Sequence, residues 1–94
     1  MSQQLELCIL DILNTREKIK DTHGEILRIE RMFFDLFCRY NKEEDSKEQA
    51  KILMMINDCF SSLSASSTIL KECEENLNNY YDKFCRLYKE YVRM

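Results

Sequence analysis

Residues 52–94 read ILMMINDCFSSLSASSTILKECEENLNNYYDKFCRLYKEYVRM, and this stretch decides the fold. Counting forward from Ile56 in alternating steps of three and four residues reaches an almost continuous series of apolar side chains. The series comprises Cys59, Leu63, Ser66, Leu70, Cys73, Leu77, Tyr80, Phe84, Leu87, Tyr91 and Met94. An apolar position every 3.5 residues is typical of a helix that packs along another helix. The sequence therefore predicts a long helix over residues 47–92, and we call this row of side chains its seam.

The first half of the chain carries a second heptad pattern, over residues 3–41. One row of that pattern reads Leu5, Ile12, Ile19, Ile26, Phe33 and Tyr40. The row three residues further along reads Cys8, Thr15, Thr22, Ile29 and Leu36. Over about five heptads, chance becomes an improbable source of such periodicity. The pattern predicts a second long helix with a seam of its own.

A polar segment, NKEEDSK at residues 41–47, separates the two patterns, and we expect the connection at residues 42–46. Ser46 followed by Gln49 fits a capping box at the start of the second helix. Asp45 followed by Glu48 fits the same pattern one residue earlier. Neither glycine nor proline forces a stop in this segment, so a single unbroken helix is the alternative.

Small residues gather at two places that a chain folded back near residue 43 would bring together. Residues 61–68 read SSLSASST, and the single glycine, Gly24, then lies opposite Leu63 inside this run. Leu63 and Leu70 keep the register, so we expect the serine run to be helical. The pairing of small residues favours a close approach of the two backbones over a hinge.

Composition bounds the class of protein. The chain has 94 residues with 33 % charged and 45 % hydrophobic side chains, which suits one helical domain over residues 1–94 and argues against disorder. The net charge of -3, with both signs interspersed, argues against nucleic-acid binding. No export signal or spanning segment is recognisable, and the five cysteines are irregularly spaced. We therefore expect a cytoplasmic or nuclear protein with reduced thiols that is not secreted.

Residues capable of catalysis or of metal binding form no recognisable site. His23 is the only histidine and belongs to no nucleophile or base motif. The cysteines lack the C-x-x-C spacing of zinc sites, and no glycine-containing calcium loop or phosphate-binding loop exists. We expect no catalytic, cofactor-binding or metal site, and hence no enzyme.

Apolar side chains outnumber what a two-helix hairpin can bury along one seam. Exposed patches of this kind usually mark an interface, although a purely intramolecular core with a few exposed tyrosines is the simpler alternative. The predicted seam and interface residues are Ile12, Ile19, Phe33, Phe37, Tyr40, Phe60, Leu63, Leu70, Leu77, Tyr81, Phe84, Tyr88 and Tyr91. Two hairpins could associate into a four-helix bundle, or another protein could supply the missing helices.

These observations predict an all-α protein in which two long helices form an antiparallel coiled-coil hairpin that assembles into a four-helix bundle. The predicted function is that of a non-enzymatic interaction module, a scaffold or adaptor subunit of an intracellular complex. Its partners would be a second copy of the chain, helical segments of other proteins, or both. The alternative is a peripheral membrane-binding helical protein that uses residues 5–13 and the aromatic C-terminal part. Acidic residues on the polar face argue against membrane binding, because such helices favour Lys and Arg.

Overall fold

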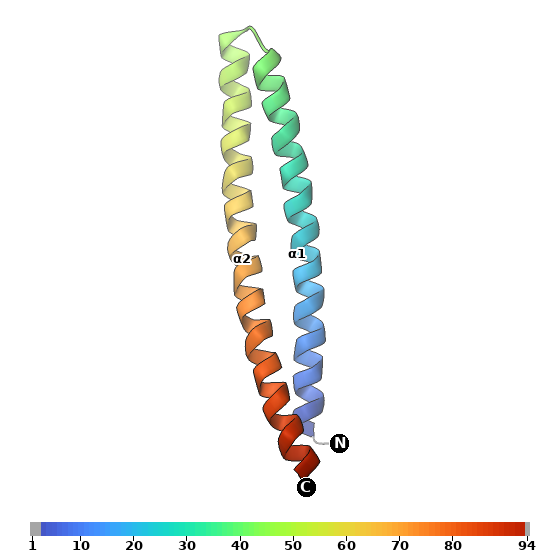
Figure 1. The fold of residues 1–94 in the computed structure, drawn as a ribbon. Coiled ribbons are helices and arrows are strands. Elements are labelled where there is room, and N and C mark those ends of the chain that lie inside the picture. The colour runs from blue at the N-terminus through green and yellow to red at the C-terminus, as the bar shows by residue number, and fades with distance from the viewer. Residues whose placement is uncertain (1–2, 94) are drawn as a thin grey trace. The chain divides into compact units, whose positions relative to one another are not determined.

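The computed structural model describes residues 3–93 and consists of two α-helices in this range, with no strand. Helix α1 spans Gln3–Lys42 and has 40 residues, and helix α2 spans Ser46–Arg93 and has 48. Figure 1 shows the two helices joined by a short connection. The predicted all-α class is therefore confirmed. Residues 43–45 form the connection, so the chain is not one unbroken helix.

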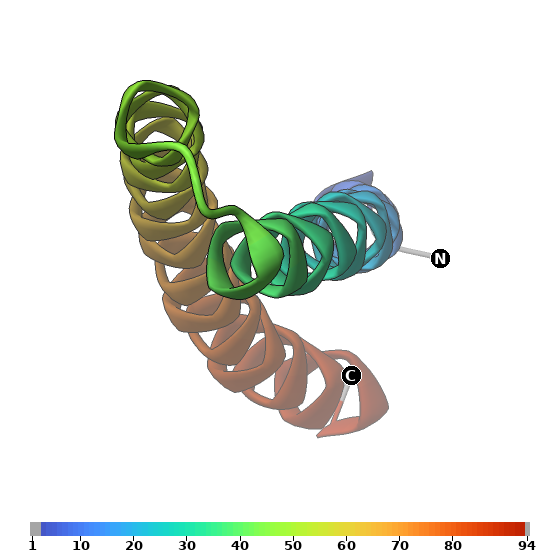
Figure 2. The same cartoon turned by 90° about the horizontal axis from the view of Figure 1, so that it is seen from above.

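Asp45 starts helix α2. Its carboxylate accepts a hydrogen bond from the backbone N–H of Lys47 at 3.0 Å, and its backbone carbonyl accepts one from Gln49 at 2.9 Å. A side-chain oxygen that binds the first free N–H groups of a helix is the defining property of an N-cap. Asp45, rather than Ser46, is thus the capping residue, and the second of the two predicted caps is the one that forms. Figure 2 shows the connection from above.

The side chain of Gln49 ties the start of α2 to the end of α1. Its Nε2 donates to the backbone carbonyl of Glu43 at 2.8 Å and lies 3.5 Å from that of Tyr40. The last carbonyls of a helix have no partner inside the helix, so this amide satisfies groups that water would otherwise bind. Arg39 and Lys42 place positive charge in the same last turn, where the helix dipole favours it.

The described chain forms two compact units, each built from parts of both helices. Unit 1 joins Met1–Asp21 with Leu70–Met94, of which residues 3–21 and 70–93 are described. Unit 2 is the continuous stretch Thr22–Ile69 and contains the connection.

Unit 2 has the larger apolar core. Five buried residues form it: Ile29, Leu36, Ile52, Ile56 and Cys59. Three half-buried side chains pack against it: Phe33, Tyr40 and Leu63. All eight lie on the seams or on their continuation to Ile52. Burying one large apolar side chain contributes roughly 1.5–3 kcal/mol, so this cluster is the main source of stability in the unit.

Unit 1 has a smaller core at the seam. Leu5, Cys8, Ile12 and Cys73 are buried there, and Cys8 is 1 % exposed. The Cys8 thiol lies 3.4 Å from the backbone carbonyl of Tyr80 and donates to it. A thiol in this setting behaves as a small apolar side chain with a weak donor.

Exposure follows the predicted periodicity along α2. From residue 49 to residue 87, the buried and half-buried residues recur in alternating steps of three and four, and every residue between them is exposed. In α1 all eleven predicted seam positions are buried or half-buried, and Ile9, Asp11 and Cys38 are half-buried in addition. The seam of α2 does not extend to Tyr91, which is exposed. Met94, its last predicted member, lies outside the described residues.

Gly24 does not serve a close approach of the backbones, so that expectation is wrong. A Cβ atom built on Gly24 would meet nothing within 4 Å, and the residue is exposed. It lies off the seam, on the solvent side of α1, where a missing side chain improves no packing. The serine run, in contrast, is helical as predicted, and the Thr68 hydroxyl donates to the Ser64 carbonyl at 3.0 Å within it.

Candidate helix-binding faces of unit 2

An open groove of about 520 Å³ runs along one flank of the seam in unit 2. Buried seam residues Ile29, Leu36 and Cys59 form its floor. Its other lining residues are Glu25, Arg28, Met32, Asp35, Arg39, Met55, Asp58 and Ser62. Each of these eight immediately precedes a seam residue, so they share one flank of the two helices. We call this flank the groove face.

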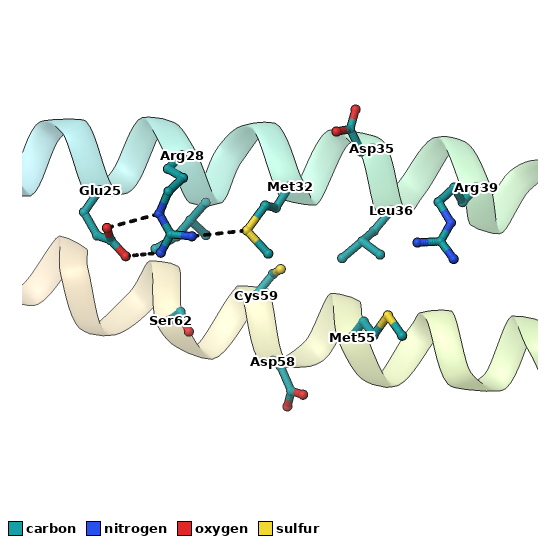
Figure 3. Close-up of a pocket in the computed structure, with 11 residues that line it drawn as sticks. Glu25, Arg28, Met32, Asp35, Leu36, Arg39, Met55, Asp58, Cys59 and Ser62 are labelled. Atoms are coloured by element: carbon teal, nitrogen blue, oxygen red, sulfur yellow. Dashed lines mark hydrogen bonds and ion pairs between the residues drawn. The ribbon is translucent and has the colours of Figure 1, made fainter.

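Figure 3 shows how the side chains of the groove face lie. Glu25 and Ser62 lie toward one end of the view, and Arg39 and Met55 toward the other. Asp35 and Asp58 point away from the space between the helices. The floor is therefore apolar, whereas the rims carry charge.

Arg28 is the best-connected charge on the groove face. Its guanidinium donates to both carboxylate oxygens of Glu25, with Nε 3.3 Å from Oε2, and its Nη1 lies 3.6 Å from the Met32 sulfur. The hydrogen bonds between Arg28 and Glu25, and the attraction between their opposite charges, lower the pKa of Glu25 and raise that of Arg28. A second ion pair, Lys51 with Glu48 at 3.0 Å, lies on the same flank.

The opposite flank of unit 2 is apolar and aromatic. Its large side chains each immediately follow a seam residue, so helix geometry puts them on the other side of the seam from the groove. They are Leu27, Phe34, Phe37, Leu53 and Phe60. Their exposed fractions lie between 43 % and 69 %. We call this flank the aromatic face.

Charge separates the two faces sharply. Unit 2 has twelve positions that immediately follow a buried or half-buried seam residue, and only one of them, Glu30, is an Asp, Glu, Lys or Arg. Twelve further positions in the unit immediately precede such a residue, and seven of these are charged. The seven are Glu25, Arg28, Asp35, Arg39, Glu48, Lys51 and Asp58. A surface depleted of charge and enriched in phenylalanine has the composition of the centre of a protein interface.

The corresponding flank of unit 1 differs from the aromatic face. Charged residues interrupt it at Glu6, Arg16, Lys20, Lys71 and Glu74. Tyr81 lies on it as well, and its hydroxyl accepts a hydrogen bond from Arg16 Nη1 at 2.8 Å. On this flank a tyrosine therefore binds an arginine of the same chain, and the surface with almost no charge is a property of unit 2.

The predicted interface residues fall into four groups, two in each unit. In unit 2, Phe33, Tyr40 and Leu63 pack against the core, whereas Phe37 and Phe60 belong to the aromatic face. In unit 1, Ile12 is buried, and Ile19, Leu70, Leu77 and Phe84 are half-buried. The exposed ones in unit 1 are Tyr81, Tyr88 and Tyr91.

Three members of the aromatic face were not among the predicted interface residues: Leu27, Phe34 and Leu53. The signal that identifies them is their place immediately after a seam residue. Phe34 is the most exposed of the three, at 69 %.

Groups that could carry chemistry remain separate across residues 3–93. No three His, Cys, Asp or Glu side chains in that range are placed to hold a metal ion. His23 is exposed, and all five cysteines have free thiols. Neither described helix contains a stretch long and apolar enough to cross a bilayer. The aromatic face and the groove are therefore the features from which a function can be argued.

Comparison with protein-family models, with curated proteins and with solved structures finds no match for this chain.

Proposed function

We propose that this chain is a non-enzymatic coiled-coil interaction module, a scaffold or adaptor subunit of an intracellular complex. The aromatic face of unit 2 carries the proposal, because it exposes large apolar side chains with almost no charge among them. Apolar patches rimmed by polar residues are typical of surfaces that bind another protein. A cytoplasmic or nuclear location suits the five free thiols.

The architecture that we propose is an antiparallel hairpin. Support comes from unit 2, where the Gln49 amide binds a carbonyl of Glu43 and Ile52 joins the same core cluster as Leu36. The groove supports it as well, because Glu25 lies toward the same end as Ser62, and Arg39 toward the same end as Met55. Two further helices laid on the aromatic face would complete a four-helix bundle.

Energetics favour a partner for the aromatic face. Fully burying a leucine or phenylalanine side chain contributes roughly 1.5–3 kcal/mol, and about half of each of these five side chains is still in contact with water. A partner helix that covers these exposed parts would add much of the remaining burial free energy. The helices that do so could belong to a second copy or to another protein.

A peripheral membrane-binding role is the alternative, and the charge pattern of unit 2 disfavours it. Helices that lie in a bilayer surface place Lys and Arg beside the apolar side chains, where they meet anionic lipids. None of the twelve positions on the aromatic flank is Lys or Arg. Co-flotation with anionic liposomes separates the two roles, and we expect the chain to stay in the unbound fraction.

A site-specific cross-linker tests the interaction role directly. A photoreactive phenylalanine analogue placed at Phe34 or Phe60, in the cell of origin, should cross-link to identifiable helical segments of this or another protein. The matched control carries the analogue at Ser61, which is exposed and belongs to neither face. Equal, background-level cross-linking at all three positions would contradict the proposed function.

A further inference from the structure

We propose that the aromatic face of unit 2 is covered by the same face of a second copy, so that the chain forms a twofold-symmetric dimer. The proposal rests on the interaction role above and names its partner. It assigns Leu27, Phe34, Phe37, Leu53 and Phe60 to the contact between copies. The groove face then remains open to solvent on both copies.

The distribution of charge favours the aromatic face of the second copy, and not its groove face, as the surface that covers the aromatic face of the first. Covering the aromatic face with a groove face would bring it against a flank with seven charged positions out of twelve. Removing charges from water is costly even where they are paired, so that contact is unfavourable. In a contact between the aromatic faces of two copies, each copy contributes only one carboxylate, that of Glu30. A contact of like with like closes on itself as a twofold dimer.

Side-chain size gives the face a complementary shape. Along each helix, the positions of the aromatic face lie alternately nearer to the seam and farther from it. The side chains at the farther, outer positions differ in size between the two helices. On α1 they include Leu27 and Phe34, whereas on α2 they are Ala50, Asn57 and Ser64. A twofold axis parallel to the helices of an antiparallel hairpin places α1 of one copy against α2 of the other. Bulky outer residues then meet small ones twice, as interdigitated packing requires.

The exposed area of the five side chains reaches the size of a small protein interface. A fully buried phenylalanine removes about 150–250 Å² from water, so the exposed parts of Phe34, Phe37 and Phe60 amount to roughly 350 Å² per copy. With Leu27 and Leu53 from both copies, the buried total reaches about 1,000 Å². That is the lower bound expected for a specific protein interface.

Glu30 provides a test that loss of folding cannot imitate. It is the one charged residue on a face that would be desolvated, and each dimer would contain two copies of it. Replacing it by the neutral isostere in Glu30→Gln should therefore tighten association, by roughly tenfold in Kd. A misfolded variant would not show this gain.

Sedimentation equilibrium of the purified full chain, over about 1–100 µM, tests the proposal. We expect a dimer for the wild type, a Kd raised at least roughly 100-fold by Phe34→Glu or Phe60→Glu, and a tighter dimer for Glu30→Gln. Met32→Glu and Met55→Glu are the matched controls, because these groove residues are 45 % and 46 % exposed, and they should leave the Kd unchanged. Circular dichroism verifies that each variant remains helical.

Three outcomes would overturn the dimer. They are a wild-type chain that is monomeric at about 100 µM, a dimer that the groove variants dissociate instead, and a Glu30→Gln variant with weakened association. A monomeric wild type whose Phe34 position still cross-links to other proteins in cells would leave the interaction role intact. Absence of cross-links at that position would remove the interaction role itself.

Discussion

The groove face and the aromatic face of unit 2 lie on either side of the same seam and differ in charge. On the groove face, Arg28 binds Glu25 and Lys51 binds Glu48 within one helix each. The aromatic face has a single charged position, and its large side chains contact water. Four of the seven charges on the groove face are thus paired with neighbours three residues away, whereas the large side chains of the aromatic face have about half of their surface in water. One heptad pattern thus accompanies two flanks of opposite composition, one rich in charge and one apolar.

Both faces are built on the seam, so a cavity in the seam should lower the free energy of unfolding more than any other change considered. We expect Ile56→Ala to lower the free energy of unfolding by about 2–5 kcal/mol, because Ile56 is 5 % exposed within the core cluster. Urea denaturation followed by circular dichroism measures this. Ser61→Ala, at an exposed position of the same helix, should change it by less than about 0.5 kcal/mol. Similar losses for the two variants would show that the seam does not carry the stability of unit 2.

Periodicity was enough to predict the fold class and the seam. A helix repeats its environment every 3.6 residues, so the sequence alone located Ile29, Leu36 and Cys59 inside. It could not decide between Asp45 and Ser46 as the cap, because both fit the capping pattern and only the backbone geometry distinguishes them.

The aromatic face was only partly predictable. Phe37 and Phe60 are among the predicted interface residues, whereas Leu27, Phe34 and Leu53 are not. Which flank stays open depends on where the partner helix lies, and a pattern in one helix does not contain that information. The prediction for Gly24 was wrong because it considered only the small size of the residue. Its position relative to the seam leaves it in open solvent.

Removing charge from the groove face tests whether charge is what distinguishes the two faces. Replacing two of the three carboxylates that line the groove, in Asp35→Leu with Asp58→Leu, leaves fewer charges along its rims. We expect a second association surface and species larger than a dimer by multi-angle light scattering. The control Glu75→Leu with Asp82→Leu makes the same change in charge and apolarity at exposed positions of unit 1, away from both faces. Larger species in the control as well would attribute the effect to general hydrophobicity.

Gly24 lies on neither face and should affect stability alone. A helical glycine costs about 0.5–1 kcal/mol relative to alanine, and an added Cβ meets nothing within 4 Å. Gly24→Ala should therefore raise the free energy of unfolding by about that amount, measured by urea denaturation. The association constant from sedimentation should stay the same. A destabilised variant would indicate a neighbour at this position, and altered association would extend the interface to it.

We expect the smallest change in stability from removing the ion pair between Glu25 and Arg28 on the groove face. Arg28 lowers the pKa of Glu25 in the folded chain, so the pair stabilises the fold at pH values above the ordinary pKa of a glutamate. That contribution is lost as the pH falls through the lowered pKa. Glu25→Gln should therefore be slightly less stable than the wild type at about pH 7 and equal to it at about pH 3, by urea denaturation at low salt.

The exposed control for that ion pair is Glu17→Gln on the same helix, which should show a smaller difference at about pH 7. About 1 M salt should abolish the Glu25 effect, because exposed charges are screened over a few ångströms at that concentration. A Glu25→Gln effect that persists in salt and at low pH would mean that the carboxylate is needed for packing. In that case the groove face would resemble the aromatic face in depending on contacts that water cannot replace.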